Sequence, residues 1–366
     1  MTSRALPPYL RCIEAIAVDA AVAATPLARR VRERLPGLPF RVLGEGEQPE
    51  AVGPGQLLYL KQYRGRFFKF CPGTSQYRCC AYRIAHIGEN CPLSCTYCIL
   101  QAYFQDRVLK VWANQEDLFG ELGRVAAAAP GKRFRVGTGE FTDSLALEAV
   151  TGMSRDLVEF LGSFDNVCLE LKSKVVDLSW MEAVRRPDRV LPAWSLNSPQ
   201  VHATQERGTA SLEDRLAAAR ECARMGFRVC LHFDPVIIHP GWEAGYARTV
   251  EMLFDYLRPE QVAYLSLGSF RSMPRLFEII ADSHPEAAYI HDEYVPGLDG
   301  KLRLLRPLRV RQLRYLAGLL RAGGLRQQLY LCMESDQVWQ AVLGTTPGRL
   351  GGLGRMLMDR AFGTDR

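Results

Sequence analysis

The chain has 366 residues, of which 48% are hydrophobic and 23% are charged. This composition is that of an ordinary globular protein and excludes a disordered chain, and the length suits one α/β barrel with additions. The net charge of +6 permits an anionic partner without requiring one.

The cysteine content indicates the compartment. Eleven cysteines in a chain that starts without a signal peptide favour a reducing cytoplasm over a disulfide scaffold. No apolar run approaches the ~20 residues needed to span a bilayer. We therefore expect a cytoplasmic protein that does not cross a membrane.

Residues 1–80 form a first region that packs on the rest. Residues 20–35 predict a helix, which Pro36 ends. Residues 57–70, LLYLKQYRGRFFKF, interleave basic and aromatic side chains, a pattern that can follow a phosphate backbone while stacking on bases. The same pattern is typical of a strand or hairpin with one solvated basic face. Both interpretations stay open at this point.

From about residue 80 the chain alternates between short β-rich runs and helical stretches. This alternation predicts an α/β fold of right-handed βαβ units, in which six parallel strands curl into a partial (β/α)6 barrel over residues 81–285. The carboxyl ends of such strands carry the functional side chains. The predicted strands are residues 82–88, 134–139, 167–173, 190–197, 227–236 and 261–270, and the predicted helices are residues 115–129, 145–161, 179–185, 212–225, 241–257 and 273–283.

Three cysteines follow the first predicted strand at the spacing C-x3-C-x2-C: Cys91, Cys95 and Cys98. Three thiolates on one short loop can hold three irons of a [4Fe–4S] cluster and leave the fourth iron open. Buried core cysteines would need an apolar face, which this polar loop lacks. Structural zinc would need a fourth ligand, usually from a second matched pair, and the other eight cysteines offer none. The motif therefore predicts an iron–sulfur site.

Polar side chains stand where the later strands end. Glu140 follows the second strand and offers a carboxylate to an ammonium group. Lys174 ends the third strand, and Ser195 and Asn197 end the fourth. His232 lies in the fifth strand, where a histidine bonded within the core is the more common finding. These residues are candidates for one binding site.

The cysteine spacing, with an aromatic residue just before the last cysteine, resembles that of the radical S-adenosylmethionine (SAM) enzymes. The resemblance implies the same six-stranded barrel and a [4Fe–4S] cluster whose open iron chelates SAM. It also implies reductive cleavage of SAM to a 5′-deoxyadenosyl radical, with an electron donor such as a ferredoxin or flavodoxin. Gly139 and Glu140 are similar to the glycine-glycine-glutamate element that holds the SAM amino group, with Thr138 in place of one glycine.

Longer stretches over residues 80–300 resemble the spore photoproduct lyase family. The resemblance lies in CxxxCxYCxLQ from Cys91, SLNS at 195–198, RLAAAR at 215–220 and HPGWEAGY at 239–246. It implies radical reversal of a thymine–thymine lesion in DNA, with Tyr97 as a radical relay. It also implies that Glu140, Lys174, Ser195 and Asn197 help to bind SAM.

Two positions depart from that family. Phe141 stands where the family has a cysteine that returns a hydrogen atom to the product radical, and Ile99 stands where it has a second relay tyrosine. The Phe141 departure supports an alternative, radical modification of a peptide or small molecule. A third hypothesis is an iron–sulfur protein that binds nucleic acid without catalysis.

The remaining residues, 286–366, predict a hairpin, a helix and a tail. The hairpin covers residues 293–307 with Asp299-Gly300 at its turn, and an amphipathic helix with a basic face covers residues 308–320. The resemblance implies that the hairpin enters lesion DNA, although the basic residues also suit a solvated helix. Cys332 is a hydrogen donor candidate if this part covers the barrel, and the glycine-rich residues 348–356 predict a flexible tail. The basic residues are Lys301, Arg303, Arg306, Arg309, Arg311 and Arg314.

Overall fold

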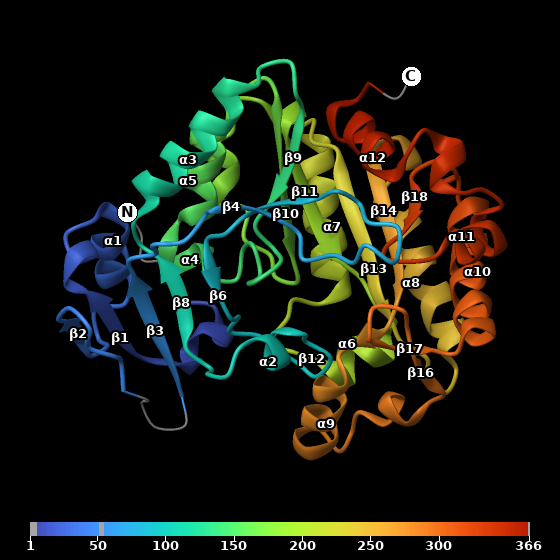
Figure 1. Ribbon diagram of the computed structural model, residues 1–366, viewed down its shortest axis with the longest axis horizontal. Helices are drawn as coiled ribbons and strands as arrows, with labels where there is room; N and C mark the ends of the chain where they lie inside the picture. Colours follow the sequence, from blue (N-terminus) through green and yellow to red (C-terminus); the bar gives the residue numbers. More distant parts are fainter. Residues whose placement is uncertain (1–5, 51–54, 365–366) are drawn as a thin grey trace.

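The computed structural model describes residues 6–50 and 55–364. Its largest sheet has eight strands in the order β18-β14-β13-β11-β10-β9-β5-β4, and it curls into an open barrel (Figure 1). Six of these strands run parallel and in chain order from β5 to β14, which confirms the predicted partial barrel. The strands are β4 (Phe68–Phe70), β5 (Arg83–Ala85), β9 (Phe134–Gly137), β10 (Val167–Ser173), β11 (Val190–Ser195), β13 (Val229–Val236), β14 (Val262–Ser269) and β18 (Leu329–Leu331).

Helices connect the parallel strands and cover the outside of the sheet. The predicted helix at residues 145–161 is interrupted at Gly152, whose φ of 60° is left-handed. The predicted helix at residues 179–185 is a short 3-10 helix instead. The connecting helices are α3 (Gln115–Ala128), α4 (Glu148–Thr151), α5 (Met153–Leu161), η3 (Ser179–Ala183), η4 (Pro187–Arg189), α6 (Pro199–Gln205), α7 (Leu212–Arg224), α8 (Trp242–Tyr256), η5 (Pro259–Gln261), α9 (Pro274–Ser283) and η6 (Ala288–His291).

The central strands are buried on both faces, so they read as almost continuous apolar runs. All eight residues of β14 are buried, and so are the six of β11. Large side chains such as Trp180 and Trp194 fill the core without exposure. Burial of this extent positions the strand ends firmly, and those ends carry the site.

A second sheet lies beside the barrel, in the order β2-β1-β3-β8-β6. It draws β6 and β8 from beyond residue 80, so the proposed boundary at that residue does not separate the two sheets. Helix α1 begins after Thr25, whose hydroxyl caps it, and covers only part of the predicted residues 20–35. The elements are η1 (Pro8–Cys12), β1 (Ile13–Asp19), η2 (Ala20–Val22), α1 (Pro26–Arg34), β2 (Phe40–Leu43), β3 (Gln56–Lys61), β6 (Gly88–Glu89) and β8 (Leu109–Trp112).

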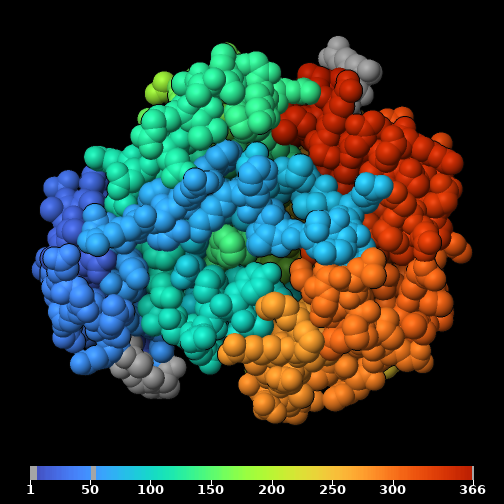
Figure 2. Space-filling view, viewed as in Figure 1, coloured from blue at the N-terminus to red at the C-terminus, as the bar shows by residue number. Residues whose placement is uncertain are grey.

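Residues 62–82, which we call the strap, run from this second sheet across the barrel to its far side and back (Figure 1). Figure 2 shows the strap in light blue above a hollow. Two of its aromatic residues pack inward: Tyr63 stacks on Trp112 with ring centroids 4.6 Å apart, and Phe67 is buried, whereas Phe70 is exposed. Tyr63 and Phe67, which belong to the interleaved pattern of residues 57–70, are thus part of the core. This placement supports the interpretation of that pattern as a strand or hairpin with one solvated basic face.

The C-terminal part closes the barrel. The predicted hairpin forms from β16 and β17, and β18 extends the barrel sheet beside β14. The flexible tail predicted for residues 348–356 is wrong, because α12 begins at Leu353 and buries Leu353, Leu357 and Ala361 one turn apart. The elements are β15 (Arg271–Ser272), β16 (Tyr294–Pro296), β17 (Leu302–Leu304), α10 (Arg306–Ala322), α11 (Asp336–Leu343), η7 (Pro347–Leu350) and α12 (Leu353–Phe362). Within the described residues, no helix combines the length and apolarity needed to cross a bilayer.

Candidate active site

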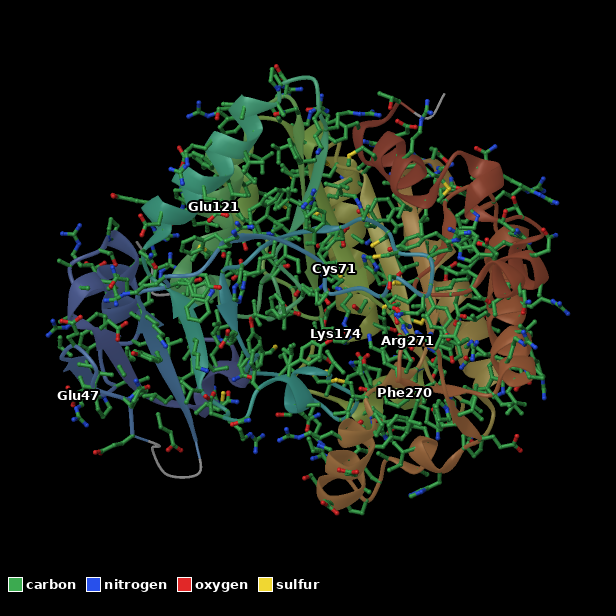
Figure 3. The ribbon with its side chains drawn as sticks, viewed as in Figure 1. Glu47, Cys71, Glu121, Lys174, Phe270 and Arg271 are labelled. Carbon is green, nitrogen blue, oxygen red and sulfur yellow. The ribbon has the colours of Figure 1, made fainter. Side chains whose placement is uncertain are left out.

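A cavity of about 320 Å³ opens at the carboxyl ends of the barrel strands, beneath the strap. Its wall consists of side chains from the cysteine loop, from six strands of the barrel sheet, from the strap and from the C-terminal hairpin. Figure 3 shows Cys71, Lys174 and Arg271 near the centre of the molecule, with Phe270 next to Arg271, whereas Glu47 lies at the edge. Segments far apart in the chain therefore meet in one place.

The cysteine loop is held by a small two-stranded sheet. In it β7 (Ser94–Cys95) pairs antiparallel with β12 (Glu206–Arg207), so that Cys95 lies opposite Glu206. The side chain of Gln101, in α2 (Leu100–Tyr103), donates to the carbonyls of Cys95 and Thr96 at 3.2 and 3.0 Å. These bonds fix a loop that has little apolar packing of its own. Cys91, Cys95 and Cys98 all line the cavity.

Tyr97, Lys174, Glu206 and Arg215 form a buried network beside these cysteines. The carboxylate of Glu206 accepts the hydrogen bond of the Tyr97 hydroxyl, pairs with Arg215 at 2.7 Å and lies 3.5 Å from the Lys174 ammonium. Burial would raise the pKa of Glu206, but Lys174 and Arg215 hold it down at about 2. The carboxylate is thus ionised at neutral pH and fixes the Tyr97 ring against the cavity.

Asp143 is a second carboxylate beside the cysteine loop. It joins burial in raising the pKa of Cys91 and Cys98. Its own oxygens accept from the Ser173 hydroxyl and the Lys174 backbone N–H at 2.7 and 2.8 Å. We call the region of Cys91, Cys95, Cys98, Tyr97, Asp143, Lys174 and Ser195 the cluster end of the cavity.

A charged group inside the barrel forms the floor. Glu170 lies 3.1 Å from the His232 Nε2 and 3.4 Å from Arg135, and it accepts from the Tyr264 hydroxyl. The other ring nitrogen of His232 lies 2.7 Å from the Ser266 hydroxyl. His232 is therefore bonded within the core as the sequence favoured, although it also borders the cavity.

A different set of side chains lines the opposite region, which we call the far end. Glu140 has Lys172, Asp234 and Lys301 as its charged neighbours. Cys71 and Cys332 lie near each other, near Cys80 and near the same two lysines. Arg271 pairs with Asp234 at 3.1 Å. The far end consists of Cys71, Cys80, Glu140, Lys172, Asp234, Phe270, Arg271, Lys301, Tyr330 and Cys332.

The predicted site residues meet here with one exception. Cys91, Cys95, Cys98, Tyr97, Glu140, Lys174 and Ser195 all line the cavity. Asn197 is buried behind it, where its side chain accepts from the Tyr246 hydroxyl at 2.5 Å and donates to the Pro235 carbonyl at 3.1 Å. The roles assigned to these residues stay predictions.

Phe141 packs away from the cavity. Its ring lies 4.9 Å from the His86 ring and 6.5 Å from Phe104, and the Lys69 ammonium lies 5.7 Å from its centroid. Its neighbours Glu140 and Thr142 do line the cavity. A side chain at position 141 therefore occupies an aromatic pocket in this protein.

The donor set fits an iron–sulfur cluster. Among the residues described here, no three His, Cys, Asp or Glu side chains converge closely enough to hold a single metal ion. A [4Fe–4S] cluster presents a separate iron to each thiolate, so its ligands need not converge on one atom. Three thiols from one loop on one cavity wall match that requirement, and metal binding would supply the energy to deprotonate them despite their burial.

Comparison with known proteins agrees with this site. The spore photoproduct lyase family model matches residues 74–290. The chain is 22% identical over 199 residues to the spore photoproduct lyase of Clostridium acetobutylicum, covering 54% of this chain and 57% of that protein. It is 26% identical over 161 residues to the enzyme of Geobacillus sp., covering 44% and 47%. The chain thus spans about half the length of the curated relatives it matches.

Solved structures show the same fold. One spore photoproduct lyase variant superposes with a TM-score of 0.75 at 19% identity, covering 87% of this chain and 98% of that one. A second variant, with bound AdoMet and dinucleoside spore photoproduct, gives a TM-score of 0.74 over the same shares. These likenesses cover 87% of the chain, a larger part than the residues 74–290 that the family model matches.

Proposed function

The chain belongs to the spore photoproduct lyase family, and from that premise we propose that it is a radical SAM enzyme that reverses a thymine–thymine lesion in DNA. The observation that carries the proposal is the cavity itself, because the three thiols of the cysteine motif and the polar side chains of the far end line one and the same cavity. A SAM-derived radical formed at the cluster end would face a substrate held at the far end. A relative of the same fold was solved with AdoMet and dinucleoside spore photoproduct bound.

Cys91, Cys95 and Cys98 would hold a [4Fe–4S] cluster. With SAM bound, such a cluster supplies a 5′-deoxyadenosyl radical on reduction. Cys95 is buried and Cys91 and Cys98 are half-buried, so the wall of the cluster end would limit the access of water to a carbon radical formed there.

Lys174 and Ser195 support SAM binding from the strand ends at the cluster end. Because the Lys174 ammonium is also held by Glu206, it is oriented before any ligand enters. Asn197 contributes from behind the wall by fixing the fourth strand end through Tyr246. Glu140 is the predicted partner of the SAM amino group, and its neighbours at the far end allow it to contact substrate as well.

The final hydrogen atom would come from a thiol at the far end, because Phe141 has none. Cys332 lines the cavity from just after β18, and burial raises the pKa of its thiol, so it keeps the S–H bond at neutral pH. Transfer of that hydrogen atom to a carbon radical would form the product C–H bond and leave a thiyl radical on sulfur. One electron from the reductant that the reaction already requires, with a proton, would restore the thiol.

The proposal is tested by anaerobic reconstitution with iron and sulfide, followed by addition of SAM and a strong reductant. We expect 5′-deoxyadenosine to form faster with ultraviolet-irradiated spore-type DNA than with intact DNA, and the dithymine lesion to disappear. Equally slow SAM cleavage with both DNAs, with a persistent lesion, would instead favour a peptide or small-molecule substrate. Binding of DNA without SAM cleavage would favour the non-catalytic hypothesis.

A further inference from the structure

Two lysines at the far end of the cavity make no hydrogen bond, close ion pair or ring contact within residues 6–50 and 55–364. The sequence contains seven lysines. Five of them bond to, pair with or lie over another side chain within the described residues. Lys172 and Lys301 do none of these within the same residues, and both line the cavity. A charged group on a cavity wall without a protein partner is typical of a ligand-binding position.

The arginines that follow Lys301 in the sequence, in contrast, bond to other protein groups. Arg303 pairs with Asp299 at 2.8 Å, and Arg309 pairs with Glu334 at 2.9 Å, both out of contact with solvent. Lys301 alone, of the six basic residues that follow Gly300, is directed to the cavity without a bond to the described protein. The other three bond to protein groups as well: Arg306 to Gln337, Arg311 to Glu243 and Arg314 to the Ala341 carbonyl.

The two lysines come from opposite sides of the site. Lys172 is the next-to-last residue of β10, in the middle of the barrel sheet, and Lys301 lies in the turn between β16 and β17. Burial lowers the pKa of Lys301, and Arg271 lowers it further. The pKa of Lys172 is raised, because Glu140, Glu170 and Asp234 outweigh its burial.

The carboxylates at the far end do not balance these charges. Asp234 pairs with Arg271, and Glu170 pairs with Arg135 and lies beside His232. Glu140 is left to face both lysines. Cys80, whose thiol pKa is lowered to about 5 mainly by the Cys79 thiol, has Arg135 as its cationic neighbour. The groups that line the far end without a close ion-pair partner are thus two ammonium groups and one carboxylate. A ligand with a single negative charge would complete the site.

Aromatic rings border the same region. Phe270, Tyr103 and Tyr330 line the cavity around the lysines. Planar bases can stack on such rings, whereas a phosphate group between two bases needs cationic donors. The far end thus combines the two kinds of contact that a short piece of nucleic acid requires.

We propose that Lys172 and Lys301 bind the phosphodiester group of a dinucleotide unit in the substrate. This inference rests on the proposed function, and it adds that the enzyme recognises the bridging phosphate of the lesion as well as its bases. A phosphodiester carries one negative charge, and its two free oxygens can each accept from one ammonium group. The carboxylate of SAM is the other monoanion in the reaction, so the test must separate the two.

The test combines a change in the protein with a change in the ligand. Reconstituted wild-type protein and Lys301→Met are titrated with the lesion as a dinucleotide, which has the phosphodiester, and as a dinucleoside, which lacks it. We expect Lys301→Met to weaken dinucleotide binding by about tenfold and dinucleoside binding by less than about twofold. Lys132→Met, on the exposed loop before β9, is the control and should change neither. Lys172→Met should repeat the pattern if its thermal unfolding is unchanged.

Two further measurements decide the remaining outcomes. Equal losses for both ligands, or a weaker affinity for SAM in Lys301→Met, would overturn the phosphodiester assignment. Titration with inorganic phosphate tests the subsite without any lesion. If the wild type binds phosphate and Lys301→Met does not, the result supports the phosphate subsite. If the wild type also binds neither form of the lesion, the lesion is not the substrate, and the subsite serves another phosphodiester. Phosphate binding that is unchanged in Lys301→Met would overturn the subsite.

Discussion

At the scale of single residues, the three cluster cysteines have the clearest consequence. Cys95 is buried and fixed by β7, so its thiol cannot be replaced by a neighbour. We expect Cys95→Ala to abolish both the visible absorbance of the reconstituted cluster and the cleavage of SAM. Cys12→Ala, which removes a thiol bonded only to Tyr9 and Gln56, should retain both. Normal iron absorbance in Cys95→Ala would contradict the cluster assignment.

A second residue-scale prediction concerns the hydrogen donor. In deuterated solvent an exchangeable thiol carries deuterium, so we expect the repaired thymine to acquire it from Cys332. Cys332→Ser should lower lesion reversal at least tenfold while 5′-deoxyadenosine still forms, because the stronger O–H bond does not yield its hydrogen. Phe141→Cys should give little recovery, since position 141 packs against His86 and Phe104. Retained reversal in Cys332→Ser would shift the role to Cys71 or Cys80.

The sequence predicted the site residues that have a local signal. The cysteines have a characteristic spacing, and Glu140, Lys174 and Ser195 follow predicted strands, so strand order alone brings them together. Glu206 could not be found in this way, because it lies in the two-residue strand β12, directly after α6, and reaches Cys95 only through the pairing of β12 with β7. Lys172 stands with Ser173 and Lys174 at the polar end of the third predicted strand, and the closed barrel shows that it lines the same cavity as Lys301.

At the scale of elements, the βαβ alternation was predictable because buried parallel strands are apolar and bounded by turns. Strand β8 was missed, since it follows the cysteine loop and joins the other sheet beside β3. Helix α12 was missed because glycines at 348–354 hide its apolar positions. In both cases long-range packing decides the element, and a local pattern does not report it.

Glu148 couples the α4–α5 junction to pH. Burial raises the pKa of its carboxyl group to about 7, although the Ser154 and Arg155 backbone N–H groups donate to it at 2.7 and 3.0 Å. The folded state therefore binds the proton more tightly than the unfolded chain, whose pKa is near 4.5. The stability from this proton is fully present below pH 4.5 and is lost as pH rises through 7, a change of about 3 kcal/mol.

We expect Glu148→Gln to remove that dependence, because the amide keeps an acceptor oxygen without a charge. Urea unfolding at pH 5 and pH 8 measures it: the free energy of unfolding should fall with pH in the wild type and much less in the variant. Glu116→Gln, in the exposed first turn of α3, should follow the wild type. Parallel curves for all three proteins would contradict the prediction.

At the scale of the whole molecule, the strap links three parts that are distant in sequence. It leaves the N-terminal sheet, crosses the cavity and reaches the C-terminal part (Figures 1 and 2). There Arg78 pairs with Asp336, with its Nε at 2.7 Å, and its backbone N–H donates to the Glu334 carbonyl at 3.1 Å. Cys71, Cys80 and Tyr82 line the cavity from above. The strap therefore forms one wall of the cavity and connects the N-terminal sheet to the C-terminal part.

Tyr77 is the contact that holds the strap to the hairpin. Its hydroxyl accepts from the Leu298 backbone N–H at 3.0 Å, and the Arg303 guanidinium lies 3.9 Å from its ring centroid. Tyr77→Ala removes both contacts, worth about 1–2 kcal/mol together. We expect amide hydrogen exchange in residues 62–82 to accelerate about tenfold, while exchange in β13 and β14 stays unchanged, because the loss is local.

Tyr256→Ala is the matched control, since it removes a ring 4.7 Å from Arg220 on the outside of the barrel and should leave the strap unaffected. Unaltered exchange in the strap of Tyr77→Ala would show that other contacts hold it, and acceleration throughout the protein would show that Tyr77 stabilises the whole fold.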